Sequence, residues 1–476
     1  MIGSAAGPVR CYRCMTGVKF FTYAGRGGTI AGNPAAQQPI ECKVVTHMRQ
    51  THLLKGIAAI ACLTMTVTGC AGGSSGGAGT STPPTVGSSA GASSAPPASS
   101  APSGSGVASS GPGSSAPPSS GPVVGSSVAS GKACAGSIGF MGPITGGAAA
   151  IGGEQLHFAQ LAVDTFNVQN KSTYSIVQGD TQLDPGQAST VAQQFVSNNA
   201  ILGVVGPAGS QEVDAIGPVY NAAHLAFVSA SATATELTAG KYPTFFRTIP
   251  NDAVQGPTDA TFIHQKLNAK NVVIVQEKTS YGQGLAASVG SALKSQGVAV
   301  TVVQVSKTQP DYSAVVTKVA DDTDVVFATF QIAANTQVLA TQLKQQGKKA
   351  VVFGSDGSFS ADFKTPGAYV SSFAPDVKSI PSAVAVVKAY TAKYGDFATT
   401  YGPPTYVATQ TILQAAQRAC QAGSPDRAAV LAQVKKTKIT DSILGGTLKF
   451  TPNGDVAGAK FYVFKIGASG KPQLAQ

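Results

Sequence analysis

Short apolar runs alternate with amphipathic segments of helix length from residue 137 onward. The apolar runs are rich in β-branched residues, which is typical of buried strands. The segments between them repeat apolar residues at the helical period, as at Leu156, Val163 and Phe166. We therefore predict strands at residues 137–140, 201–205, 225–228, 271–275, 298–305, 325–330 and 350–353.

This alternation predicts βαβ units and an α/β fold, with mostly parallel strands covered by helices on both faces. The repeated units are too many for one comfortable sheet. A break in the pattern at 247–256, which contains Pro250, Asn251 and Gly256, is typical of a connection rather than an element. We predict that the chain crosses there between two lobes.

The loops after several predicted strands are rich in Gly, Ser and Thr, namely 142–147, 206–210, 229–233 and 354–357. Ligands bind outside the carboxyl ends of strands in such sheets. Glycine lets backbone N–H groups approach a ligand, and hydroxyls at a helix N-terminus suit a carboxylate. Asp356 can pair with an ammonium group. Together these loops predict a site for a zwitterion.

Each of these residues also has a structural interpretation, and the sequence leaves it open. Ser210 and Thr233 are good helix N-caps without any ligand. Asp356 beside Gly357 suits a turn, and Tyr281 can simply pack inside the second lobe.

The N-terminal part has a different composition. Residues 71–131 consist only of Gly, Ser, Ala, Pro, Thr and Val, without charge or aromatic rings. Such a segment cannot bury enough apolar surface to offset chain entropy. We predict a disordered tether with an r.m.s. span of roughly 40 Å.

The tether follows a predicted secretory signal at 48–69, with a short basic start and an apolar run from 56 to 68. The run is too short for a stable membrane span. Its end, Val67-Thr68-Gly69-Cys70, is similar to the bacterial lipobox. We therefore expect Cys70 to be lipidated and the protein to be held at the outer face of the cytoplasmic membrane. Because 1–47 fits poorly as part of a signal, our hypothesis is that translation starts at Met48.

The net charge of +11 does not indicate nucleic-acid binding. Residues 1–69 hold seven of the 33 basic residues and one of the 22 acidic ones. The rest of the chain therefore has 26 basic and 21 acidic residues, and it contains no run of basic residues. This balance is normal for a solvated surface. Cys11 and Cys14 have metal-ligand spacing but no second pair of ligands, so we expect no metal site.

Processing would leave only Cys134 and Cys420 besides Cys70. Two thiols in an exported domain suggest a disulfide. Two separate, buried free cysteines remain the alternative.

An enzyme is not indicated. The G-x-S-x-G pattern at 87–91 lies in the predicted tether, without the strand and helix that a nucleophile elbow requires. Residues 282–287 partly match a dinucleotide fingerprint, but the following strand ends without an acidic residue for a ribose.

An ordered set of motifs resembles the branched-chain amino-acid-binding proteins, type I periplasmic binding proteins that serve ABC importers. The resemblance is collinear from Cys134 to about Ile466. It is carried by residues 206–210, 231–238, Arg247 with 255–257, 281–284, 354–357, 444–446 and 454–455.

The resemblance implies a set of ligand-binding residues. Ser210 and Thr233 would hold the ligand carboxylate, with help from the backbone near Ser231 and Ala232. Asp356 would bind the α-ammonium group, and Tyr281 would line the pocket from the second lobe. The second-lobe aromatic residue of the family falls at Gln331 or Phe330, and the first-loop aromatic falls at Ile151. The first-lobe disulfide of the family is absent, because one of its positions corresponds to Gly209.

The implied architecture is two α/β lobes, each a mostly parallel sheet flanked by helices, joined by three hinge crossings. The first lobe would comprise 134–250 and 380–446, and the second 251–379 and 447–472. Cys134 and Cys420 would then share a lobe, which favours their disulfide.

The resemblance also implies a monomeric binding protein without cofactor that captures a branched-chain or related amino acid and delivers it to a membrane permease. An amide or aromatic acid as ligand remains open, as does a sensing module that reports to a membrane receptor.

Overall fold

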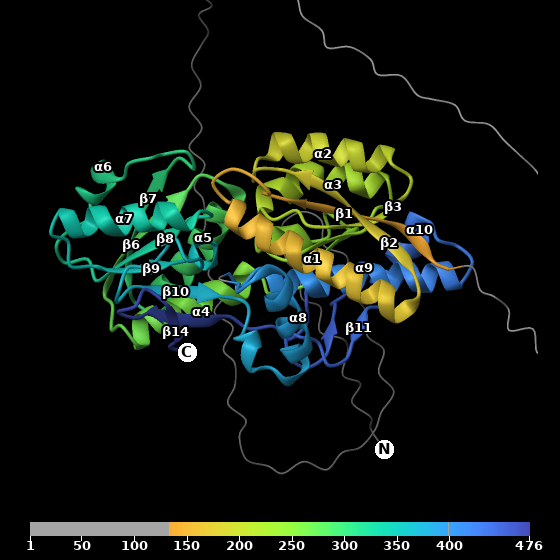
Figure 1. Ribbon diagram of the computed structural model, residues 1–476. Helices are drawn as coiled ribbons and strands as arrows, with labels where there is room; N and C mark the ends of the chain where they lie inside the picture. Colours follow the sequence, from red (N-terminus) through yellow and green to blue (C-terminus); the bar gives the residue numbers. More distant parts are fainter. Residues whose placement is uncertain (1–132, 398) are drawn as a thin grey trace, which may run out of the picture. The chain divides into compact units, whose positions relative to one another are not determined.

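The computed structural model describes residues 133–397 and 399–476 (Figure 1). The predicted leader, signal, tether and Cys70 lie outside the described residues. The described part falls within the chain unit Pro118–Gln476 and contains two large sheets. Within it, none of the helices is both long and apolar enough to span a bilayer.

The first sheet is entirely parallel and has the order β2-β1-β3-β4-β5. Its strands are β1 (Ala135–Gly142), β2 (Thr173–Asp180), β3 (Ile201–Val205), β4 (Phe227–Ser229) and β5 (Phe245–Arg247).

Helices cover both faces of this sheet, which with them forms the first lobe. Two helices lie on one face, α2 (Pro185–Ser197) and α3 (Ser210–Ala222). The opposite face carries α1 (Ala149–Asn170) and α9 (Gly402–Gln421), which run side by side in Figure 1. The lobe also contains α8 (Val384–Tyr394), α10 (Arg427–Val434), β11 (Lys438–Ile439) and β12 (Leu448–Lys449).

The second sheet has the order β14-β13-β10-β9-β8-β6-β7 and is parallel except for its last two strands in the sequence. Its strands are β6 (Asn271–Glu277), β7 (Ala299–Val305), β8 (Val325–Thr329), β9 (Val351–Gly354), β10 (Tyr369–Ser372), β13 (Tyr462–Ile466) and β14 (Pro472–Leu474). Together with this sheet, the second lobe contains α4 (Asp252–Gln265), α5 (Ser280–Ser295), α6 (Ser313–Val316) and α7 (Ala333–Gln345).

The two-lobed α/β fold predicted from the sequence is confirmed. Each predicted strand corresponds to an observed strand, with bounds that differ by at most two residues. Strands β2, β5 and β10 to β14 were not predicted. Strands β5, β10, β11, β12 and β14 have at most four residues, and β2 lies at a sheet edge where it is only partly buried, so their patterns are weak.

The described chain passes between the lobes after β5, again after β10, and again after β12. The first crossing is shorter than the predicted segment 247–256. Asn251 is the N-cap of α4, where its side chain accepts a hydrogen bond from Ala253 N at 3.1 Å. The helix therefore takes in the second half of the predicted crossing, residues 252–256. The exact lobe boundaries proposed above stay a prediction.

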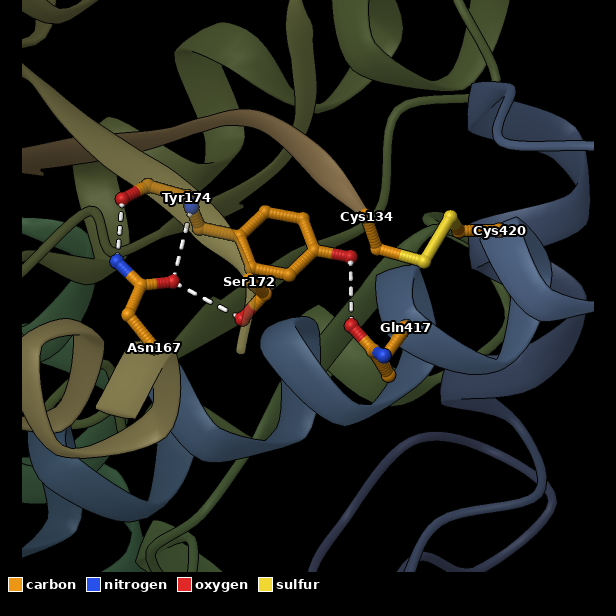
Figure 2. The surroundings of a disulfide bond; sticks show 6 residues. All are labelled: Cys134, Asn167, Ser172, Tyr174, Gln417 and Cys420. Carbon is orange, nitrogen blue, oxygen red and sulfur yellow. Dashed lines mark hydrogen bonds between the residues drawn. A yellow bond between two sulfur atoms is a disulfide. The ribbon is translucent and has the colours of Figure 1, made fainter. Parts of the chain in front are cut away.

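A disulfide joins Cys134, which immediately precedes β1, to Cys420 in the last turn of α9 (Figure 2). Beside it, the Tyr174 hydroxyl of β2 donates a hydrogen bond to Gln417 of α9 at 3.3 Å. The two cysteines lie 286 residues apart in the sequence. A disulfide that closes so long a loop restricts the unfolded chain. Such a disulfide stabilises the folded state by roughly 3 to 5 kcal/mol.

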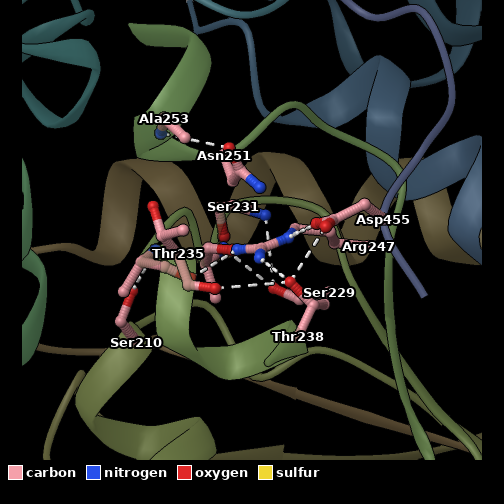
Figure 3. Close-up of polar contacts among 11 residues, drawn as sticks. Ser210, Ser229, Ser231, Thr235, Thr238, Arg247, Asn251, Ala253 and Asp455 are labelled. Atoms are coloured by element: carbon pink, nitrogen blue, oxygen red, sulfur yellow. Dashed lines mark hydrogen bonds and ion pairs between the residues drawn. The ribbon is translucent and has the colours of Figure 1, made fainter. Parts of the chain in front are cut away.

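Arg247 is the last residue of β5 and is fully buried (Figure 3). Its guanidinium donates hydrogen bonds to the carbonyls of Ala232 and Ala234, at 3.0 and 2.8 Å. It also donates to the Thr238 hydroxyl at 2.6 Å and to the Asp455 carboxylate at 2.6 Å. One side chain therefore joins the loop after β4 to the third crossing.

The third crossing approaches β5 closely through Gly454. The carbonyl of Gly454 accepts a hydrogen bond from Arg247 N at 3.0 Å. Gly454 has φ +95°, and a Cβ atom there would lie 2.4 Å from the Phe245 carbonyl oxygen. Both the positive φ angle and the close approach to the Phe245 carbonyl therefore require a glycine at this position.

We predict that Arg247→Met lowers the free energy of unfolding by about 3 to 5 kcal/mol. The change removes the charge partner of Asp455 together with four hydrogen bonds that one buried side chain donates. Urea denaturation followed by circular dichroism measures the effect. The matched control is Lys241→Met, which removes an exposed ion pair with Asp214 and should cost less than about 1 kcal/mol. Equal, small effects of both changes would contradict the prediction.

Candidate functional site

A pocket lies between the two lobes, at the loops that follow the carboxyl ends of their strands. It holds about 360 Å³ of space free of atoms, part of which opens to solvent. The lining residues are Pro143, Ile151, Leu183, Ala208, Ser210, Ser231 and Tyr401 from the first lobe, and Tyr281, Gln331, Asp356 and Gly357 from the second.

Two serine hydroxyls line the pocket on the side of the first lobe. Ser210 is the first residue of α3, and its Oγ accepts a hydrogen bond from Ala234 N at 3.2 Å. Ser231 follows β4; its Oγ donates to the Ala208 carbonyl at 3.0 Å and accepts from Gln155 Nε2 at 3.2 Å. The first turn of a helix carries partial positive charge. This wall therefore favours a negatively charged group.

The opposite wall carries a buried carboxylate. Asp356 opens the short 3-10 helix η2 (Asp356–Ser358), and only 2% of its surface is exposed. The Tyr281 hydroxyl lies 2.6 Å from Asp356 Oδ1, to which it donates, and 2.8 Å from Ser355 Oγ. Gly357 must be a glycine, because a Cβ atom there would lie 2.3 Å from the Phe330 carbonyl oxygen.

Asp356 is the acidic group of this region that ionises most readily. Burial raises the pKa of Asp356 to about 6, and the hydrogen bond from Tyr281 opposes that shift. Burial raises the pKa of Asp252 to about 8 and, with Asp356 nearby, holds the pKa of Asp259 well above its usual range. At neutral pH the pocket therefore presents a negative charge on Asp356, whereas Asp252 holds a proton.

Tyr401 also lines the pocket, although it is not among the residues predicted from the sequence. It lies immediately before α9, and its hydroxyl donates to the Asp356 backbone carbonyl at 2.7 Å. The residue comes from a part of the chain far from the other lining residues. The signal that could have located it is Pro403-Pro404, a pair that marks the start of a helix.

Five of the seven ligand-binding residues predicted from the sequence line the pocket together: Ser210, Ser231, Tyr281, Gln331 and Asp356. Ala232 and Thr233 do not line it. The Ala232 carbonyl accepts from Arg247, and its N–H donates to Ser229 Oγ at 3.0 Å. Thr233 is fully buried, with its carbonyl accepting from Asp252 N at 2.9 Å. The ligand-binding roles of all seven stay predictions.

The remaining wall is apolar apart from one amide. Pro143, Ile151, Leu183 and Ala208 contribute aliphatic surface. Of the two candidates for the position of the family's aromatic residue, Gln331 lines the pocket. Phe330 instead packs in the core of the second lobe, stacked on Tyr312 at a centroid distance of 5.1 Å.

Among the described residues, no group of three or more His, Cys, Asp or Glu side chains is arranged so that it could hold a metal ion. Residues 282–287, which partly match a dinucleotide fingerprint, lie inside α5 and not in a loop. The helix is capped by Thr279, whose hydroxyl accepts from Gly282 N at 3.0 Å. Because helical N–H groups are used within the helix, this segment cannot cradle phosphates.

Comparison with known proteins identifies the family. The family described as periplasmic binding protein matches residues 137–471. The Leu/Ile/Val-binding protein of Escherichia coli K12 is 29% identical over 335 residues, which cover 68% of this chain and 88% of that protein. The Leu/Ile/Val/Thr-binding protein of Salmonella typhimurium is 30% identical over 304 residues, covering 62% and 80%.

Solved structures share the fold. A branched-chain amino acid transporter substrate-binding protein of Streptococcus pneumoniae, in complex with isoleucine, has a TM-score of 0.64 and 25% identity. The match covers 72% of this chain and 98% of that one. A solute-binding protein of R. palustris, in complex with benzoate, has a TM-score of 0.63 at 17% identity, covering 72% and 95%. The second likeness concerns the fold alone.

The match over residues 137–471, the two-lobed fold and the pocket between the lobes lead to one conclusion. The chain belongs to the periplasmic binding protein family, whose members are extracytoplasmic solute-binding proteins and not enzymes.

Proposed function

We propose that this protein captures an α-amino acid, branched-chain or closely related, between its lobes and delivers it to an ABC importer. The observation that carries the proposal is the opposite polarity of the two facing walls. Asp356 supplies a negative charge from the second lobe, whereas the first lobe supplies hydroxyls and the start of α3. A zwitterion complements both walls at once.

The ammonium end would lie against Asp356. Its carboxylate is buried, and an ammonium group would supply the charge partner that it lacks in the surrounding residues. Arg247, the nearby buried cation, is already paired with Asp455. Tyr281 and Tyr401 would orient Asp356 through its side chain and its backbone carbonyl.

The carboxylate end would lie at Ser210 and Ser231, near the N-terminus of α3. Thr233, proposed for the same end, is buried behind this wall, and its hydroxyl has no hydrogen-bond partner among the described residues. Ala232 would act through the backbone of the same loop.

The side chain of the ligand would then contact Ile151, Leu183 and Ala208, which favours an aliphatic group. This agrees with the names of the relatives, which bind leucine, isoleucine and valine. The chain would act as a monomer, and the importer would be a separate membrane permease. A receptor in place of a permease would make the protein a sensor with the same site.

A screen of thermal stability tests this proposal, because a ligand that binds only the folded state raises Tm. The panel contains branched-chain and other amino acids, amides and aromatic carboxylates. We expect leucine, isoleucine or valine to raise Tm the most. A rise with benzoate or an amide, and none with any amino acid, would contradict the proposal.

We predict that Asp356→Asn weakens the affinity for the selected amino acid roughly 10- to 100-fold, because a charged hydrogen bond becomes a neutral one. Isothermal titration calorimetry measures Kd. The matched control, Asp362→Asn, removes an exposed carboxylate from the same region and should leave Kd unchanged. Equal affinities of the parent and the Asp356 variant would contradict the assignment.

We also predict that affinity decreases as the pH falls through about 6. Below this value Asp356 holds a proton, which an ammonium group must displace, so Kd at about pH 5 should be about tenfold higher than at pH 7.5. Burial raises the pKa of Asp252 to about 8, above this range, and it also raises the pKa values of Asp259, Tyr281 and Tyr401. Asp356→Asn should remove this part of the pH dependence.

We propose further that Cys70 carries the lipid that holds the protein at the outer face of the membrane. The lipobox-like sequence supports this, and so does the exported nature of the family. We predict that the parent protein partitions into the detergent phase of Triton X-114 and that Cys70→Ser moves it to the aqueous phase. Ligand binding should not change. A parent protein found in the aqueous phase would contradict lipidation.

A further inference from the structure

The turn between β2 and α2 has an unfavourable backbone conformation beside the pocket. Gln182 and Leu183 both adopt positive φ angles, 51° and 61°, although neither is a glycine. Such conformations are rare for residues with a Cβ atom and concentrate at functional sites. Leu183 is also buried and lines the pocket, where it packs with Ala148 and Ala208.

Residues from both lobes hold this turn. Within the first lobe, Asp180 Oδ1 accepts from Gln182 N at 3.1 Å, and Thr181 Oγ1 accepts from Leu183 N at 3.4 Å. From the second lobe, Lys307 Nζ donates to the Leu183 carbonyl at 2.5 Å. The position of Leu183 therefore depends on a side chain across the cleft.

A second contact across the cleft lies next to the first. Gln211 of α3 and Gln331 of the second lobe exchange two amide hydrogen bonds, at 3.0 and 3.1 Å. Gln211 Nε2 also lies 3.4 Å from the Leu183 carbonyl, to which it donates. We call Leu183, Gln211, Lys307 and Gln331 the clasp. The two of them that line the pocket, Leu183 and Gln331, come from opposite lobes.

The charge around Lys307 also connects the lobes. Burial raises the pKa of Glu212 in the first lobe to about 7, and that of Glu277 in the second lobe to about 7. The Lys307 ammonium opposes both shifts. Glu212 Oε1 and Glu277 Oε2 are buried without hydrogen-bond partners among the described residues. Lys307 thus faces acidic groups on both sides of the cleft.

We propose that Leu183 is a specificity-determining residue for the side chain of the ligand, and that Lys307 is the positioning residue that fixes it when the lobes close. The inference rests on the proposed function, because it concerns the same pocket. Separation of the lobes breaks the bond from Lys307 and the two Gln211–Gln331 bonds. Discrimination between side chains therefore develops only after closure, and it appears in the dissociation rate rather than the association rate.

The test compares Lys307→Met with Lys307→Arg in the full chain. Stopped-flow fluorescence gives the association and dissociation rates of two amino acids that bind the parent and differ by one or two carbons. Lys307→Met should raise the dissociation rate about tenfold, because a charged donor is lost, and leave association unchanged. It should also reduce the ratio of the two Kd values. Lys307→Arg keeps a charged donor, so its dissociation rate and its ratio of Kd values should be close to those of the parent.

Two further variants separate specificity from folding. Lys318→Met removes an exposed lysine of the second lobe and should change neither rate. Leu183→Ala should shift the preference toward the larger of the two amino acids, because it enlarges the pocket. Urea denaturation confirms that each variant is folded.

The outcomes distinguish this inference from the proposed function. A parent protein that binds no amino acid refutes the proposed function. Small-angle scattering then still tests the clasp, because Lys307→Met should increase the radius of gyration through a larger open population. If Lys307→Met changes neither the ratio of Kd values nor the dissociation rate, the inference is wrong. Where no ligand is known, the inference is wrong if Lys307→Met changes neither the radius of gyration nor the unfolding midpoint.

Discussion

The buried guanidinium of Arg247 is the interaction on which the site most depends. A buried cation is tolerated only when its donors and its charge are matched. The matching groups belong to the loop after β4 and, through Asp455, to the third crossing. Arg247 thus fixes both the loop that carries Ser231 and the third crossing, along which the chain leaves the first lobe. The geometry of the pocket and the geometry of the crossing therefore depend on the same side chain.

The same cost of burying a charge determines which carboxyl group ionises at the second-lobe wall of the pocket. Burial raises the pKa of Asp252, Asp259 and Asp356, and the bond from Tyr281 opposes this shift at Asp356, whose pKa of about 6 lies below that of Asp252, about 8. The protein thereby keeps a single carboxylate at the pocket that needs an external cation. The proposed amino acid would supply this cation together with the anion that suits the first lobe. Ligand binding would then complete an electrostatic arrangement that the protein alone leaves incomplete.

How much of the fold the sequence predicts depends on burial. Strands such as β3 and β8 are buried on both faces, so their apolar runs are continuous and their bounds could be predicted closely. The edge strand β2 alternates between buried and exposed positions, and β5 has only three residues, so neither gives a strong signal. The order of the strands comes from packing of segments far apart in the chain, such as α9 on β3, and no local pattern contains it.

The candidate site divides in the same way. Ser210, Ser231, Tyr281 and Asp356 could be found because each follows a strand or opens a helix, and parallel sheets bring such positions to one edge. These residues concern the two charged ends that all α-amino acids share. Leu183 and Lys307 come into contact only because the two lobes close on each other. Neither of the two sequence segments predicts that contact. The part of the site that we propose distinguishes one amino acid from another therefore lies where sequence patterns carry least information, and where measured rates are most informative.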